Sequence, residues 1–373
     1  MYSAYLERSK STIDELIKHI RTGERLRSLV FDETISCKSE IPCFTVSSLS
    51  KDASPNYVEW KIIDHCASVT RIYAIYEQFI HEMVSEHLGL LQSRITFYRL
   101  PESLKNNYRI GISKLIDRIH TPRYSDVELT KIVANYNNAL AGQNYSLEPK
   151  AMLIQDQNLR LDELARLLRN CAIDNVKNWI TEHRSLKRFF DENDPSSSTA
   201  ESQMAELVKY RNDAAHGSIE VNDILDPNGL VEYCHFIEAI CEAVYELILS
   251  AGLKCLQQHN HVSCSGKLSE VLKDGFVGIG TIQGPLHVGQ SVFVNGKDYC
   301  FEATVTSMRV DDVEYKTLDG NTEAEVGLGF DIQIKKGAEI LIFRENLILV
   351  DNGASHIKEC IGGSVWTRTH VNR

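Results

Sequence analysis

Apolar residues recur at helical spacing through most of the first 261 residues. The clearest stripe runs from Ile62 to His87 in alternating steps of four and three, over about eight turns. It predicts a helix over about 58–91, and this length suits a core helix of a bundle or the seam of a dimer. Shorter stripes predict helices at about 158–171, 200–216 and 229–257, and the prolines in 36–56 indicate an extended segment.

The pattern changes after residue 261, where glycine becomes frequent and β-branched residues alternate with polar ones. Asn295-Gly296 is typical of a hairpin turn. Short strands are predicted at 276–282, 291–294, 303–310, 326–330 and 340–343. The fold class predicted is therefore multidomain α and β, with a helical bundle followed by a small all-β barrel.

A chain of 373 residues is long enough for two domains with real cores. The patterns divide it into an N-terminal helical or extended region at 1–57 and a helical domain at 58–261. A small β-barrel follows at 262–345. Residues 346–373 are weakly patterned and are expected to form a loosely held tail.

Composition predicts a cytoplasmic protein. No apolar run approaches 18 residues, and the N-terminus lacks the basic and apolar regions of a signal peptide. Ten cysteines occur without a Cys-x-x-Cys pair, and most lie alone on apolar faces.

The net charge of −11 argues against strong nonspecific binding to nucleic acid. A nuclease of this charge should recognise one shaped RNA, use a partner, or concentrate its basic residues locally. One basic stretch is a candidate RNA track, but nearby acidic residues favour a solvated helix face instead. It comprises Lys177, Arg184, Lys187 and Arg188.

The most informative segment is Lys-Tyr-Arg-Asn-Asp-Ala-Ala-His-Gly at 209–217. Arg211 lies where the helical pattern requires an apolar residue, and a buried guanidinium is costly without an acceptor. The segment ends at His216 and Gly217, a good helix stop. An arginine that binds phosphate and a histidine that transfers protons are components of a metal-free ribonuclease.

The Arg-x4-His spacing, with polar Asn212 directly after the arginine, resembles the HEPN superfamily (higher eukaryotes and prokaryotes nucleotide-binding), whose pattern is Arg-x4–6-His. Segments 71–80, 158–170 and 207–217 together resemble its RiboL-PSP/MAE-type branch, and the resemblance covers roughly 55–255.

This resemblance implies a helical bundle that dimerises, so that two motifs form one composite ribonuclease site without metal or cofactor. It implies attack of a ribose 2′-hydroxyl on the adjacent phosphorus, which leaves a 2′,3′-cyclic phosphate and a 5′-hydroxyl. His216 suits the proton transfer, Arg211 suits the charge on the phosphorane, and Asn212 can orient either group. Further site residues proposed around them are Arg71, Glu77 and Asp213.

Two structural alternatives remain open for these residues. Residues five apart on a straight helix point about 140° apart, so Arg211 and His216 of one chain should not converge, which fits a dimer. Alternatively, His216 interacts with the helix dipole and Arg211 pairs with a buried acid such as Glu77. Arg71 and Glu77 could equally form a structural ion pair.

The β part resembles domain 2 of translational GTPases such as elongation factor Tu, on the segments 278–292, 303–308, 326–329 and 334–340. No phosphate-binding Gly-x4-Gly-Lys-Ser/Thr motif accompanies it. In that family the barrel touches the acceptor end of aminoacyl-tRNA or the ribosome. Residues 262–345 hold eight Lys and Arg against thirteen Asp and Glu, so a structural or protein-binding barrel is an equal alternative.

The linker between the two parts carries four zinc-type ligands at a spacing that matches no standard site. Incidental residues in a helix-to-strand linker are the favoured interpretation, and no metal is expected. The four are Cys255, His259, His261 and Cys264.

The function predicted is a metal-independent endoribonuclease of toxin or antiviral defence type, acting on tRNA or another structured RNA. The barrel would select the target, or a partner such as an antitoxin or defence protein. The alternatives are a noncatalytic dimeric adaptor and a nucleotide-binding regulator. The presence of Arg211, Asn212 and His216 together favours the enzyme.

Overall fold

The structure is a computed structural model and describes residues 2–31, 54–193, 199–217, 219, 223–283, 285–318 and 324–344. Most of the predicted extended segment at 36–56 and the predicted tail at 346–373 lie outside these residues.

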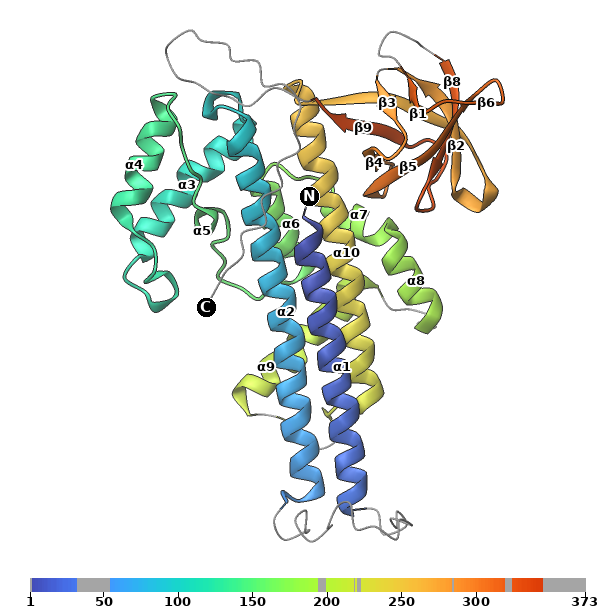
Figure 1. The fold of residues 1–373 in the computed structure, drawn as a ribbon. Coiled ribbons are helices and arrows are strands. Elements are labelled where there is room, and N and C mark those ends of the chain that lie inside the picture. The colour runs from blue at the N-terminus through green and yellow to red at the C-terminus, as the bar shows by residue number, and fades with distance from the viewer. Residues whose placement is uncertain are drawn as a thin grey trace, which may run out of the picture.

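Three long helices lie side by side and form the core of the helical part: α1 (Ser3–Phe31), α2 (Tyr57–Arg94) and α10 (Pro227–Gln258) (Figure 1). Tyr76, Phe79 and Phe236 are fully buried in the core of the helical part. Burial of each such aromatic side chain contributes about 1.5–3 kcal/mol. Among the described residues, no helix is both long and apolar enough to cross a membrane.

Shorter helices flank this core (Figure 1). On one side of the C-terminal half of α2 lie α3 (Glu102–Arg118), α4 (Leu129–Leu140) and α5 (Pro149–Met152), with 3₁₀ turns η2 (Phe97–Arg99) and η3 (Pro122–Tyr124) between them. The remaining ones are α6 (Leu161–Asn170), α7 (Val176–Glu182), α8 (Arg184–Asn193) and α9 (Ala200–His216).

The predicted helices are confirmed at α2, α6, α9 and α10, with α6 beginning three residues later than expected. The apolar side chains of α1, including Ile13 and Ile20, belong to the same core as those of α2 and α10. The described part of region 1–57 therefore packs as a helix of the bundle.

The chain after α10 forms the predicted barrel. Its strands are β1 (Val262–Leu272), β2 (Val277–Ile282), β4 (Ser291–Asn295), β5 (Cys300–Val310), β8 (Ala324–Phe330) and β9 (Glu339–Phe343). They pair antiparallel in the order β4-β9-β1-β2-β8-β5, and β5 returns to β4, so six strands close on themselves. Short pairs involve β3 (Leu286–His287) with β7 (Thr317–Leu318), and β6 (Val313–Glu314) with β5.

A bulge in β1 shifts the register between Cys264 and Gly266. A side chain at Gly266 would lie 2.2 Å from the carbonyl oxygen of Thr281, so only glycine fits this close crossing of strands.

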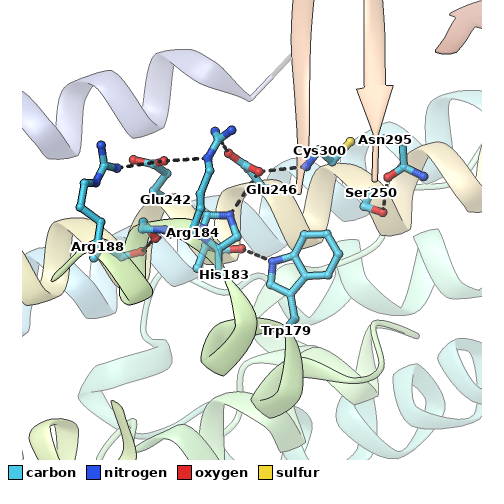
Figure 2. Close-up of polar contacts among 12 residues, drawn as sticks. Trp179, His183, Arg184, Arg188, Glu242, Glu246, Ser250, Asn295 and Cys300 are labelled. Atoms are coloured by element: carbon cyan, nitrogen blue, oxygen red, sulfur yellow. Dashed lines mark hydrogen bonds and ion pairs between the residues drawn. The ribbon is translucent and has the colours of Figure 1, made fainter. Parts of the chain in front are cut away.

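The barrel is joined to the bundle through buried contacts to α10 and the α7–α8 corner (Figure 2). The carboxylate of Glu246 is 1% exposed and accepts a hydrogen bond from the backbone N–H of Cys300 at 2.9 Å. It also contacts Nε2 of His183 at 3.2 Å and pairs with the guanidinium of Arg184. Nearby, the Ser250 hydroxyl donates to the side-chain oxygen of Asn295 at 2.8 Å.

Apolar side chains of the barrel extend the bundle core across this junction. Val262, Phe293 and Leu341 are buried and belong to the same cluster as the bundle residues. The two parts therefore share a continuous core with a buried polar network, and each buries part of the other.

Candidate functional site

Helix α9 carries the Arg-x4-His motif and is regular throughout. The hydroxyl of Thr199 accepts from the Ser202 N–H at 3.2 Å, and the Ser202 hydroxyl accepts from the Thr199 N–H at 2.9 Å. This reciprocal cap satisfies two N–H groups at the start of the helix. The helix ends at Gly217, whose φ of +69° is left-handed and whose N–H bonds to the Asp213 carbonyl. The motif is thus held on a rigid helix.

Arg211 is half-buried and rests on an aromatic ring. Its guanidinium carbon lies 5.3 Å from the centre of the Tyr73 ring on α2. Burial raises the pKa of Tyr73, whose hydroxyl accepts a hydrogen bond from the Leu159 N–H at 2.7 Å. The ring is therefore a neutral, fixed face for the cation.

Asn212 also holds the guanidinium of Arg211. Nη1 of Arg211 donates to the side-chain oxygen of Asn212 at 3.2 Å, and the Asn158 amide donates to the same oxygen at 3.1 Å. Asn158 precedes α6, so a loop from another part of the chain helps to orient the motif. The Arg211 donors that these contacts leave unused remain available to an oxyanion.

The guanidinium borders an open polar cleft of about 670 Å³. α2 forms one wall, the 155–158 loop another, and Arg123 of η3 contributes to the rim. Glu77 in this cleft accepts a hydrogen bond from Nε2 of Gln155 at 2.5 Å. Burial lowers the pKa of His81, which also lines the cleft, so this ring is neutral at neutral pH.

His216 lies apart from the cleft. It is exposed in the last turn of α9 and is not among the residues that line the cleft. Because the helix is unbroken from Arg211 to Gly217, the two motif side chains leave it about 140° apart. One chain does not bring Arg211 and His216 together.

The other sequence-predicted residues are dispersed. Glu77 lies in the cleft, Asp213 is half-buried on α9, and Arg71 is exposed on α2 outside the cleft. Among the described residues, no ion pair joins Glu77 to Arg71 or to Arg211. The contacts of Arg211 are instead Asn212 and the Tyr73 ring.

The basic stretch is neutralised by ion pairs rather than presented as an RNA track. Lys177 pairs with Asp162 at 2.5 Å, and Lys187 pairs with Glu182 at 2.7 Å. Arg184 forms an ion pair with the buried Glu246 where the barrel meets the bundle.

The four zinc-type ligands of the linker lie where α10 passes into β1. Across the residues that the structure describes, no three His, Cys, Asp or Glu side chains gather as a metal site. Cys264 is exposed on β1 and contacts the Gly266 carbonyl, whereas Cys255 is partly buried on α10.

Sequence reasoning missed several residues of the cleft. Tyr73 and Asn158 lie within the segments 71–80 and 158–170 that carry the family resemblance, but no sequence signal assigned either residue to the site. Arg123 and Gln155 lie in irregular segments without a motif or period, so no sequence signal identified them.

Comparisons with curated proteins and with solved structures yield no match. The sequence model of the RiboL-PSP-HEPN family matches residues 45–250, which include α2, α9 and most of α10. This match spans more than half of the chain and contains the whole cleft, and we conclude that the protein belongs to the RiboL-PSP-HEPN family.

Proposed function

We propose that this protein is a metal-independent endoribonuclease whose active site is shared between two chains. The observation that carries the proposal is the setting of Arg211. Its guanidinium is held by Tyr73 and Asn212 at the edge of an open polar cleft, in a member of a family whose domain is often nuclease-like. A fixed arginine with unused donors is suited to the charge on a phosphorane.

The proposed reaction is an internal transfer at one phosphodiester. His216 takes the proton of a ribose 2′-hydroxyl, and the oxygen forms a bond to the adjacent phosphorus. Arg211 stabilises the extra negative charge while the bond from phosphorus to the 5′-oxygen breaks. The leaving oxygen takes up a proton, so the products are a 2′,3′-cyclic phosphate and a 5′-hydroxyl end.

Two chains are proposed because one α9 cannot direct both groups to one phosphate. In a twofold dimer, His216 of one protomer can face Arg211 of the other. The exposed end of α9 leaves His216 accessible for such an arrangement.

The barrel is proposed to select the target or a partner. Its share of acidic residues disfavours general backbone binding, so contact with RNA would be local, as at a tRNA end. A toxin or antiviral defence role, with an antitoxin or defence protein as partner, is the biological setting we propose. We also propose a cytoplasmic location.

The test is incubation of the purified chain with total RNA in EDTA, followed by sequencing of 5′-hydroxyl ends. Discrete new ends that disappear with His216→Ala support the proposal. Activity that requires added Mg²⁺ would contradict the mechanism. Intact RNA under all conditions would favour a noncatalytic dimeric adaptor or a nucleotide-binding regulator.

A further inference from the structure

The carboxylates that line the cleft are already engaged. Glu82 pairs with Arg8 of α1, and Asp156 pairs with Arg118 of α3 at 2.6 Å. Glu77 accepts the short hydrogen bond from Gln155. Two of the three carboxylates are therefore paired with arginines outside the cleft, and Glu77 is held by a neutral amide.

The two arginines of the cleft are in the opposite situation. Within the described parts of the chain, neither Arg123 nor Arg211 forms an ion pair with a carboxylate, and each lies against an aromatic ring instead. Both arginines line the same cleft as Tyr73, and their positive charges lower the pKa of that tyrosine against the larger rise caused by burial. Two uncompensated guanidinium groups on one cleft indicate an anionic ligand with more than one charge.

Arg123 is placed by its neighbours rather than by its own hydrogen bonds. Pro122 begins η3, and the buried Tyr124 anchors that turn beneath the arginine. The guanidinium carbon of Arg123 lies 6.0 Å from the Tyr124 ring centre, and the residue is exposed. Its donors are therefore free to bind a ligand without breaking a structural contact.

The size of the cleft restricts the form of that ligand. Its volume of about 670 Å³ lies within the range of about 300–1,000 Å³ that holds drug-sized molecules. One or two unpaired nucleotides are of this size, whereas an A-form RNA duplex is recognised by its shape across a wide, shallow minor groove. We propose that Arg123 binds a second phosphate of an unpaired RNA strand whose scissile phosphate meets Arg211, an inference that rests on the ribonuclease function proposed above.

The test uses a short single-stranded RNA labelled with a fluorophore and the full chain carrying His216→Ala, so that binding is measured without cleavage. Adding Arg123→Gln should weaken binding about tenfold. It should also reduce the slope of log K against log salt concentration by about 0.7, the value expected for one phosphate contact on a single strand. Arg123→Lys should recover part of the affinity, since it retains the charge without the planar fork. A duplex of the same sequence should show no dependence on Arg123.

Arg109 provides the matched control, because it is an exposed arginine of α3 that does not line the cleft. Arg109→Gln removes the same charge and should leave affinity and salt dependence unchanged. Equal effects of Arg123→Gln and Arg109→Gln would overturn the inference.

Cleavage assays without the His216 substitution separate this inference from the proposed function. Cleavage with an unchanged KM in Arg123→Gln would overturn the role of Arg123 and leave the ribonuclease intact. Binding of RNA that depends on Arg123, in a chain that never cleaves, would support the second phosphate site and overturn the nuclease. Failure to bind any RNA would overturn both.

Discussion

At the scale of single residues, Arg211 is held by an aromatic face and an amide oxygen rather than by a carboxylate. A carboxylate partner would neutralise the guanidinium and compete with phosphate for its donors. Tyr73 and Asn212 orient the same group while leaving its full charge available. This arrangement suits an arginine that must meet an anion.

The fork geometry of this arginine gives a specific prediction. Arg211→Lys should lower kcat about 100-fold or more, because an ammonium cannot span two phosphate oxygens in a fixed plane. Single-turnover cleavage of a defined RNA would measure the loss. Lys209→Arg on the same helix serves as a control and should keep full activity. An unchanged kcat in Arg211→Lys would show that Arg211 does not take part in the chemical step.

Buried His87 predicts how stability depends on pH. It is 2% exposed on α2, and burial lowers its pKa to about 4, against about 6.5 in an unfolded chain. The unfolded chain therefore binds a proton more readily, so the contribution of His87 is complete above about pH 6.5 and is lost as pH falls toward 4. The contribution amounts to up to about 3 kcal/mol.

Urea unfolding between pH 4 and 7 measures this effect. The free energy of unfolding should fall as the pH is lowered from 7 to 4, and His87→Leu should make this dependence on pH less steep. An unchanged slope in the variant would show that His87 does not titrate differently in the folded chain.

At the scale of elements, the site depends on α9 being straight and well terminated. Thr199 and Ser202 cap its start, and Gly217 ends it in a left-handed conformation directly after His216. A side chain at Gly217 would meet nothing within 4 Å, so a substitution there tests the backbone alone.

Gly217→Ala should lower the free energy of unfolding by about 1 kcal/mol, because a Cβ disfavours positive φ. Gly217→Asn should cost less, since asparagine tolerates this region. Chemical denaturation of both variants would compare them. A loss as large in the asparagine variant as in the alanine variant would argue against the left-handed end of the helix.

The sequence predicted the elements better than the cleft between them. Apolar spacing and capping residues gave α9 at 200–216, because helix ends are set by local chemistry. The barrel was expected from its alternating strands and its resemblance to a known domain. The closure of the barrel, in which β4 pairs with both β5 and β9, depends on long-range packing. The same is true of the cleft that Arg123, Gln155 and Arg211 line together. No local sequence pattern predicts such contacts.

At the scale of the whole molecule, Glu246 links the barrel to the bundle. Its buried carboxylate is held by His183, Arg184 and the Cys300 N–H (Figure 2). The guanidinium of Arg184 also lies 5.0 Å from the ring centre of Phe301 in the barrel. If the barrel selects the target, as we propose, this network would present that target to the bundle at a constant position.

Removal of one partner of this network should be costly. Arg184→Ala leaves Glu246 buried with fewer donors and should lower the free energy of unfolding by about 2–4 kcal/mol. Arg188→Ala is the matched control, because that side chain is 61% exposed and lies 3.9 Å from Glu242, so its loss should cost below about 1 kcal/mol. Urea unfolding compares the two, and equal losses would refute the role of the network.

The composite site is the central claim, and mixing two inactive variants tests it most directly. Arg211→Gln and His216→Ala should each be inactive alone. If Arg211 acts with His216 of the other protomer, a mixed dimer retains one intact pair, and a refolded equimolar mixture should recover roughly a quarter of wild-type cleavage. If both groups act within one chain, every pair in the mixture is defective. Recovery of cleavage is the result we expect, and no recovery in a mixture shown to contain mixed dimers would contradict the shared site.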